Sequence, residues 1–285
     1  MKDKSPRLLC VVLAMVFLAL GFPAGANRAF ASDEQQNGVV RLHQDRDSRS
    51  DESKVHVLPV QGSVYMLVGA GANITVHVGR DAVLLVEGKD DCHVVLALCA
   101  VNSLTETFGI YECGSDALAI RRLNALIASS KPPHAIGLVI DADDPNLSGR
   151  WTAVRAKLAH YGYQFPPIPA AGGTILEPIP GAPRLGFWLM PNSEDTGMLE
   201  DFCCDMIDQD RLAVTKECVD LGVAKRAATF KAAHYTKAVV HTYLALQDEP
   251  GRPLGQAITA ESLRSAASPT ARLFVSWLGR LFGAL

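Results

Sequence analysis

The sequence predicts an α/β fold in which an open, parallel sheet of four strands is flanked by helices, with a β-hairpin extension before the sheet and a helical region after it. Two observations support this class. From residue 82 onward, short apolar runs rich in β-branched residues alternate with helical segments, and parallel strands joined by crossover helices produce that order. Acidic residues then stand at the ends of these runs, where open α/β sheets bind their ligands.

Composition limits the class of protein further. The 285 residues are 48% hydrophobic and carry a net charge of −3, which allows one or two packed domains and excludes a disordered chain or a strongly basic DNA-coating protein. The seven cysteines are an odd number and form no CxxC pair. They indicate buried reduced thiols rather than a disulfide framework or a zinc site.

The expected elements follow one another in a regular order. Strands are predicted at 82–86, 108–113, 134–144 and 184–191, and helices at 91–103, 115–130 and 148–162. Between the last helix and the last strand lies the stretch "AHYGYQFPPIPAAGGTILEPIPGAPRLG". Its proline clusters cannot occupy central strands, so a loop or a short edge hairpin over the end of the sheet is expected there.

Two helical segments are expected in the C-terminal region, 216–285. The stretch 225–247 places Lys231, His234, Lys237 and His241 on one broad helical face, which could contact the phosphates of a nucleic acid or could simply be solvated. The stretch 271–285 is expected to be a docked core helix, with binding to a partner or a membrane surface as the alternative. Its apolar residues at helical spacing are Leu273, Phe274, Trp277, Leu278, Leu281 and Phe282.

The N-terminus has the pattern of an export signal. A basic start, the apolar run "LLCVVLAMVFLALGF" and small residues at Ala29 and Ala31 predict a cleavable signal peptide over 1–31, and hence a secreted or periplasmic protein. An uncleaved membrane anchor is the alternative. Residues 32–54 are polar and charged, so a flexible linker is expected there.

Residues 55–81 alternate short β-rich runs with Gly and Asn turns, which predicts a β-hairpin segment. The stretch "VYMLVGAGANITVHVG" resembles the first strands of secreted metallo-β-lactamase-fold hydrolases. That family binds zinc through an HxHxDH motif, and the eight dispersed histidines of this chain form no such motif. We therefore expect no zinc site, and a degenerate hydrolase of this kind is the least favoured interpretation.

Three acidic residues mark the ends of two predicted strands. Glu87 follows the strand 82–86, while Asp141 and Asp143 end the strand 134–144 and, with Ala142 between them, alternate to one side of the extended chain. Carboxylates that face one another stay ionised at low cost only when a cation lies between them. An all-oxygen pocket of this kind suits Mg²⁺, which also keeps waters and phosphates as ligands.

Four separated motifs resemble one family. "LLVEGKDD", "GLVIDADD", "GFWLMPNSEDTGMLEDF" and "LALQDEPGRPLGQAI" are similar to an uncharacterised prokaryotic Toprim-like family, related to topoisomerases, bacterial primases and OLD-family nucleases. The resemblance runs from about Leu84 to the C-terminus. It implies a Toprim-like domain over 82–215 and identifies Glu87, Asp141 and Asp143 as ligands of Mg²⁺ or Mn²⁺.

The resemblance also implies a chemistry. In Toprim enzymes the acids hold divalent ions that polarise a phosphodiester and stabilise charge on its oxygens. No helix-turn-helix unit accompanies the tyrosines of this chain, which favours a nuclease over strand passage. A non-catalytic module that binds metal, nucleotide or nucleic acid, as a sensor or defence component, is the alternative. A homo-oligomer is compatible with either.

The remaining polar residues near these motifs have two interpretations each. Lys89 could act on a phosphate or pair with Asp90 or Asp91, and His93 is expected to pack on its helix. Glu194 and Asp195 are expected to cap a helix. For Glu200 and Asp201, capping of a helix and a supporting role around the metal, or a second metal, are both open. A supporting role is also the functional interpretation for Asp91 and Asn192.

The two ends of the chain predict different compartments. A nucleic-acid enzyme belongs in the cytoplasm, whereas the first residues predict export. The two resemblances meet inside "AVLLVEGKDD". A recombined reading frame and a genuine secreted nuclease are both consistent with this pattern.

Overall fold

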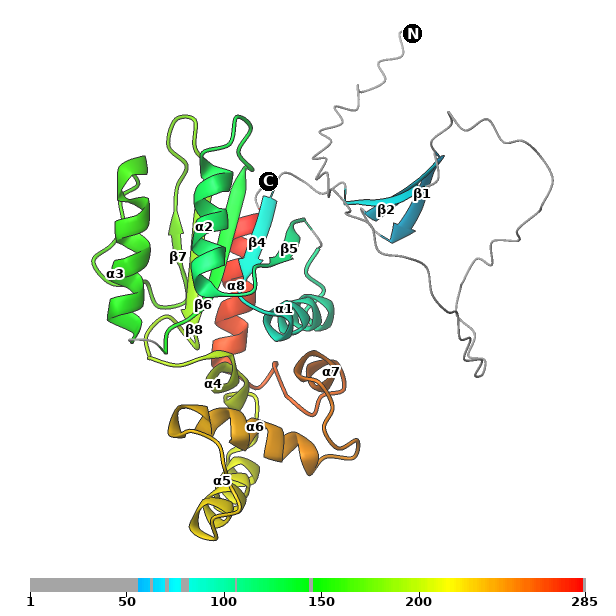
Figure 1. The fold of residues 1–285 in the computed structure, drawn as a ribbon, viewed down its shortest axis with the longest axis vertical. Coiled ribbons are helices and arrows are strands. Elements are labelled where there is room, and N and C mark those ends of the chain that lie inside the picture. The colour runs from blue at the N-terminus through cyan, green and yellow to red at the C-terminus, as the bar shows by residue number, and fades with distance from the viewer. Residues whose placement is uncertain are drawn as a thin grey trace, which may run out of the picture. The chain divides into compact units, whose positions relative to one another are not determined.

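The computed structural model describes residues 56–61, 64–69, 72–77 and 82–283 apart from 106, 144 and 145 (Figure 1). The predicted signal peptide and linker lie outside these residues. The first three strands, β1 (His56–Gln61), β2 (Val64–Gly69) and β3 (Ala72–His77), pair in the antiparallel order β1-β2-β3. This extension therefore has one strand more than the predicted hairpin.

The main sheet has five strands in the order β5-β4-β6-β8-β7. Four of them are parallel, as predicted: β4 (Ala82–Val86), β5 (Gly109–Glu112), β6 (Ala135–Asp141) and β8 (Arg184–Met190). The expectation of only four strands was wrong, because β7 (Thr174–Leu176) adds an antiparallel edge strand beside β8. This strand lies within the Pro- and Gly-rich stretch, at an edge that tolerates such residues.

Crossover helices cover both faces of the sheet, as parallel pairing requires (Figure 1). Successive residues of a strand point to opposite faces, so Leu84 and Val139 belong to one buried cluster, while Leu85 and Ile140 belong to the other. Helices α2 (Asp116–Ile127) and α3 (Leu147–Leu158), the latter extended by the short turn η1 (Ala159–Tyr161), contribute to the second cluster. Helix α1 (Lys89–Val101) contributes to the first.

Helix α8 (Pro269–Phe282) docks on the middle of the sheet, which confirms the predicted core helix. Gly137 and Gly186 pair in register on β6 and β8, and a Cβ atom at Gly186 would overlap Cδ2 of Leu281. The two glycines thus form the groove that admits the helix. Leu273 differs from its neighbours, since it is 47% exposed. Within the described part of the chain, no helix has the length and apolar character needed to cross a membrane.

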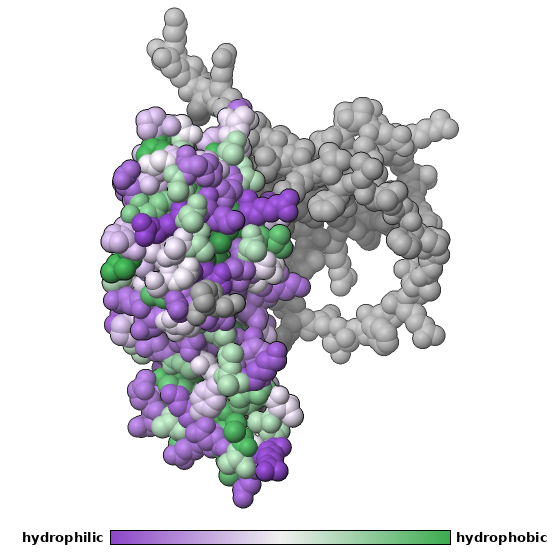
Figure 2. Space-filling model, turned by 60° about the vertical axis from the view of Figure 1, so that its left-hand side comes forward, coloured by the Kyte–Doolittle hydropathy of each residue, from purple (hydrophilic) through white to green (hydrophobic). Residues whose placement is uncertain are grey.

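A group of helical elements forms the lower end of the domain in Figure 1, where hydrophobic residues also reach the surface (Figure 2). They are α4 (Leu199–Cys204), α5 (Gln209–Ala224), η2 (Ala232–His234), α6 (Tyr235–Ala245) and α7 (Leu254–Thr259).

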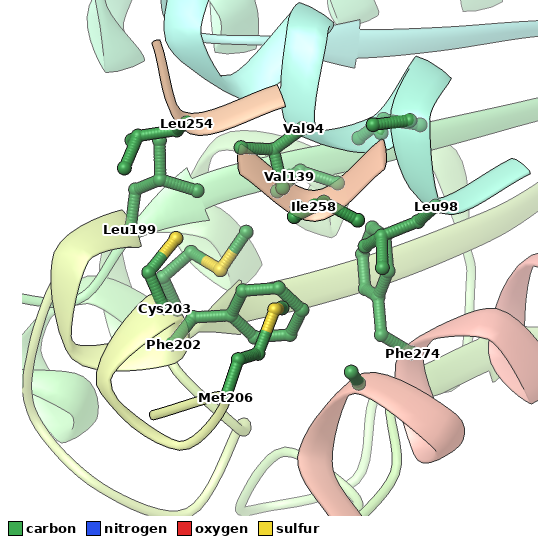
Figure 3. Packing of buried hydrophobic residues seen from close by; sticks show 14 of the residues in the cluster. Val94, Leu98, Val139, Leu199, Phe202, Cys203, Met206, Leu254, Ile258 and Phe274 are labelled. Atoms are coloured by element: carbon green, nitrogen blue, oxygen red, sulfur yellow. The ribbon is translucent and has the colours of Figure 1, made fainter. Parts of the chain in front are cut away.

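These helices share one core with the sheet. Side chains of α1, α4, α7 and α8 converge on one another, as Val94, Phe202, Ile258 and Phe274 show (Figure 3). The predicted domain boundary between residues 215 and 216 falls inside α5. The helical C-terminal region is therefore continuous with the core of the sheet domain.

The predicted helix over 225–247 is broken. Lys225 is the C-cap of α5, and Arg226 takes a left-handed conformation with φ 58°, after which the chain re-enters a helix only at η2 and α6. Lys231 has an extended backbone before η2 and therefore does not share a helical face with Lys237, contrary to the sequence-based expectation, whereas His234 is the N-cap of α6. The break has no Gly or Pro signal, because a residue other than glycine occupies the left-handed position.

Candidate functional site

Glu87 reaches from the end of one strand to the end of the next. It directly follows β4, and Gly88 after it is the N-cap of α1. The backbone N–H of Asp141, the last residue of β6, donates to Oε1 of Glu87 at 2.7 Å. Because β4 and β6 are parallel neighbours, their carboxyl ends place these two acids side by side where the parallel strands end. This end of the sheet is called the carboxyl edge below.

Asp141 is held from the opposite side by the segment after β8. Its Oδ1 accepts a hydrogen bond of 3.0 Å from the backbone N–H of Leu199, the first residue of α4. The next residue, Ala142, is buried and donates its N–H to the carbonyl of Gly197 at 2.8 Å. The loop between β8 and α4 therefore packs against the end of β6 and fixes the Asp141 carboxylate.

Burial and mutual repulsion make this edge unfavourable for negative charge. The pKa of Asp141 is raised to about 8, first by burial and then by the carboxylates of Glu87, Asp91, Asp143 and Glu200. The pKa of Glu87 is raised to about 7, again first by burial, although the Asp141 N–H opposes the rise. The strand-end acids therefore favour a bound proton or a bound cation near neutral pH.

Asp91 and Asp201 play the same structural part in two helices. Oδ2 of Asp91 accepts from the N–H of Gly88 at 3.0 Å, and Oδ2 of Asp201 accepts from the N–H of Met198 at 2.9 Å. Each carboxylate caps its helix from the third position. Asp91 is also buried, which raises its pKa to about 6, and its charge acts on Glu87 and Asp141. Asp91 thus belongs electrostatically to the strand-end acids.

Glu200 brings a paired cation to the same group. Its Oε1 lies 2.7 Å from Nζ of Lys237, and the Glu200 side chain is only 5% exposed whereas that of Lys237 is 48% exposed. The hydrogen bond to Glu200 raises the pKa of Lys237. The sequence left open whether Lys237 contacts phosphate or is simply solvated; in the structure it pairs with a buried acid whose charge acts on Asp141.

The other predicted residues are more exposed. Asp143 lies on the surface, and its charge contributes to the raised pKa of Asp141. Lys89 is exposed at the first position of α1, so it is placed near the acids but is not buried with them. Lys231 and His234 are exposed before α6.

Asn192, Glu194 and Asp195 form a turn rather than a helix cap. Oδ1 of Asn192 accepts from the N–H groups of Glu194 at 2.9 Å and Asp195 at 2.8 Å, and its amide donates to Oδ2 of Asp195 at 2.7 Å. The expectation that Glu194 and Asp195 cap a helix was wrong, because α4 begins only at Leu199 and Asp201 supplies its cap. His93 is exposed overall, while its backbone and Cβ atom lie close to Gly255 of α7.

Sequence reasoning missed one ion pair at this edge. Nη1 of Arg150 bonds to Oδ2 of Asp116, and the Arg150 side chain is only 13% exposed. Arg150 lowers and Asp116 raises the pKa of Glu87, so both act on the strand-end acids. The sequence could have suggested both residues as neighbours of the acids, because each lies in the first turn of a helix that follows a predicted strand.

The donor set suits a hard divalent cation. The hydrogen bonds above use Oε1 of Glu87 and Oδ1 of Asp141, and so leave Oε2 and Oδ2 uncommitted by them. Carboxylate oxygens at a buried edge are the ligands that Mg²⁺ or Mn²⁺ takes together with waters. Among the described residues, no three His, Cys, Asp or Glu side chains converge as a complete ligand cage. An ion held by one or two carboxylates and waters fits this arrangement.

These features define a mixed α/β domain with a buried acidic group at the carboxyl edge of its parallel strands. The chain belongs to the family described as "Protein of unknown function (DUF3226)", whose model matches residues 81–283. This range includes the main sheet and all of its covering helices. No curated protein and no solved structure matches the chain.

Proposed function

We propose that the protein is a Toprim-type phosphoryl-transfer enzyme that depends on Mg²⁺ or Mn²⁺, and that it is a nuclease hydrolysing phosphodiester bonds in nucleic acid. One observation is central to this proposal: Glu87 and Asp141 lie at adjacent strand ends, joined by a 2.7 Å hydrogen bond, with pKa values raised to about 7 and about 8. Burial and mutual repulsion of the two carboxylates are unfavourable for the fold. A cation-binding site would account for this buried pair of acids.

Glu87 and Asp141 are the residues that would hold the ion. When bound, a divalent cation supplies charge stabilisation on the phosphodiester oxygens and orients the leaving group. The loop between β8 and α4 keeps Asp141 in place through the Leu199 N–H, and Asp91 keeps the turn after Glu87 in place through the Gly88 N–H. Both acids are thereby fixed before a substrate arrives, which lowers the cost of assembling the site.

Exposed residues around this edge are suited to the substrate. Asp143 is exposed two residues beyond Asp141, where it would add a third carboxylate ligand for the ion. Lys89 is exposed at the start of α1, directly after the Glu87–Gly88 turn. Its ammonium group is the nearest exposed cation in sequence to the acids, and we assign it to a phosphate of the nucleic acid.

A second candidate function has its own support. The two partly buried cations that accompany the acids are already paired, Arg150 with Asp116 and Lys237 with Glu200. A module that binds metal and a nucleotide or nucleic acid, without catalysis, needs no further free cation. Glu87, Asp141 and Lys89 would then bind metal and phosphate without cleavage, and the protein would act as a sensor.

The test is a cleavage assay on the purified full chain with Mg²⁺ or Mn²⁺, offered single-stranded, duplex and circular DNA and RNA. We expect metal-dependent cleavage that Glu87→Gln and Asp141→Asn each reduce at least about a hundredfold, since each removes a ligand of the ion. Glu194→Gln is the matched control, because Glu194 is an exposed acid of the same region outside the group that acts on Asp141.

Cleavage by the wild type that survives in both variants would refute the assignment of the site. Phosphate or nucleic-acid binding that needs the metal, with no cleavage of any substrate, would establish the binding module instead.

A further inference from the structure

Helix α5 carries an exposed stripe that the proposed function does not use. Asp210, Val214, Cys218, Leu221 and Lys225 recur at intervals of four, four, three and four residues, which places them along one side of a helix. Val214 is 56% exposed and Leu221 is 59% exposed. The helix buries a different side, formed by Leu212, Thr215 and Val219. The stripe is therefore an apolar surface with an acid at one end and a base at the other.

A depression adjoins the N-terminal half of this stripe. It has a volume of about 500 Å³ and is lined by Val214, Tyr243 and Leu246, with Asp210 and Asp248 also at its wall. Leu246 is 61% exposed although it is a large aliphatic residue. Hydrophobic surface is visible among hydrophilic residues at this end of the domain (Figure 2). The hollow thus has an apolar part, and Asp210, Asp248 and Arg211 are the charged residues that line it.

We propose that α5 is the interface of a symmetric dimer, in which the helix packs antiparallel against α5 of a second copy of this chain. Leu221 of the second copy then enters the depression beside Val214, and the two-fold axis repeats this contact on the other side. A two-fold interface must be self-complementary, and this surface has both the projection and the hollow. The proposal is independent of the nuclease assignment.

Charge complementarity selects the antiparallel arrangement. If Val214 lies opposite Leu221 of the second copy, then Asp210 lies opposite Lys225 of the second copy. This follows because the two pairs of positions have the same midpoint along the helix. Lys225 of the second copy, one turn beyond Leu221, then lies opposite Asp210 at the wall of the depression, where Asp248 adds a second acid and Arg211 the one base of the lining. A parallel arrangement would instead bring the acidic ends together and the basic ends together.

The symmetry also places the two Cys218 side chains close to the axis. Cys218 is an exposed thiol in the middle of the stripe, between the two aliphatic residues. Helices in such contacts lie about 8–10 Å apart, so a short bifunctional maleimide can span the two sulfur atoms. Proximity of the two thiols is a direct consequence of the arrangement.

The test is a charge reversal followed by sedimentation velocity of the full chain over a range of concentrations. Asp210→Lys and Lys225→Asp are each expected to weaken dimerisation roughly tenfold or more, because each creates two like-charge contacts in the symmetric dimer. The double variant Asp210→Lys/Lys225→Asp is expected to restore it to within about threefold of wild type. Circular dichroism checks that each variant is folded.

Cross-linking provides a second measurement that needs no stability-altering change. A short bis-maleimide is expected to give a covalent dimer of the wild type, which Cys218→Ser abolishes and Leu221→Glu strongly reduces. A wild type that stays monomeric, a double variant as weak as either single variant, or cross-linking unaffected by Cys218→Ser would each overturn the proposal.

Discussion

The middle of the main sheet and its carboxyl edge are both covered by helices. They differ in the side chains that they bury, which are apolar in the middle and include repelling carboxylates at the carboxyl edge. In the middle, Gly137 and Gly186 admit Leu281 of α8 into close apolar contact, and the described residues that pack there are hydrophobic. At the edge, Glu87 and Asp141 have raised pKa values because they are buried among other carboxylates. Folding alone explains the first region. The second is unfavourable for folding by itself, and the proposed cation site would account for it.

Glu200, at the same carboxyl edge, is a buried acid that has a cationic partner within the chain. It is as buried as the core residues, but it has a lysine partner at 2.7 Å. Glu87 and Asp141 instead have backbone N–H groups as hydrogen-bond partners. The chain therefore supplies a cationic side chain for Glu200, and under the proposed function a divalent cation would take that role for Glu87 and Asp141.

The largest expected effect on stability is in the middle of the sheet. Gly186→Ala places a Cβ atom on the buried Leu281 side chain, so that side chain or α8 must shift and the free energy of unfolding is expected to fall by about 2 kcal/mol. Gly222→Ala is the control, because that helical glycine has open space around it and the change is expected to be neutral or stabilising. Urea denaturation followed by circular dichroism measures both. Equal effects of the two substitutions would contradict the existence of the groove.

A smaller effect is expected at the ion pair. Lys237→Met leaves the buried Glu200 carboxylate without its cation, which is expected to cost about 1 kcal/mol, since water can reach the half-exposed lysine position. Adding Glu200→Gln should recover most of that loss, because the uncompensated charge is then gone. Lys231→Met, at an exposed position before α6, is expected to change the free energy of unfolding by less than about 0.5 kcal/mol. A double variant no more stable than Lys237→Met would show that the uncompensated charge of Glu200 is not the cause of the loss.

The smallest effect has the opposite sign. Asp141→Asn is expected to raise the free energy of unfolding by up to about 1 kcal/mol at pH 8, because it removes a buried charge that its neighbours repel while Oδ1 can still accept from Leu199. Thermal unfolding in the absence of divalent ions measures the gain. Destabilisation by this substitution would mean that the carboxylate supports the fold rather than a ligand.

The raised pKa values also fix the direction in which the stability of the wild type depends on pH. The pKa of Asp141 in the fold is about 8 and that of Glu87 about 7, whereas unfolded carboxyls titrate near about 4. Between these values the folded state binds more protons than the unfolded state, so stability is expected to decrease as pH rises from about 4 to about 8. Asp141→Asn should flatten this decrease. A divalent cation should counteract it most strongly at the high end.

Much of the fold could be predicted from local patterns. Apolar runs bounded by Gly, Asp or Pro indicated the positions of β4, β6 and β8, and the spacing of Phe274, Trp277 and Leu281 identified α8 as a core helix. The strand-end position of Glu87 and Asp141 followed from the same reasoning. Parallel strands bring their carboxyl ends together whatever the details of the loops.

The remaining features depend on contacts that no local pattern encodes. Strand β7 has only three residues and forms because β8 offers an edge to it. The break at Arg226 has no Gly to announce it. The pairing of Glu200 with Lys237 joins two helices that lie far apart in the sequence, so a periodic pattern could suggest only that Lys237 faces solvent.

Calorimetric titration of Mg²⁺ or Mn²⁺ into the full chain at pH 8 tests the central claim most directly. We expect binding by the wild type, loss of that binding in both Glu87→Gln and Asp141→Asn, and binding that weakens as pH falls through the raised pKa values, because protons then compete for the same carboxylates. Glu194→Gln should bind as the wild type does. A wild type that binds neither ion, or binding unchanged in both acid variants, would contradict the assignment of this edge as a cation site.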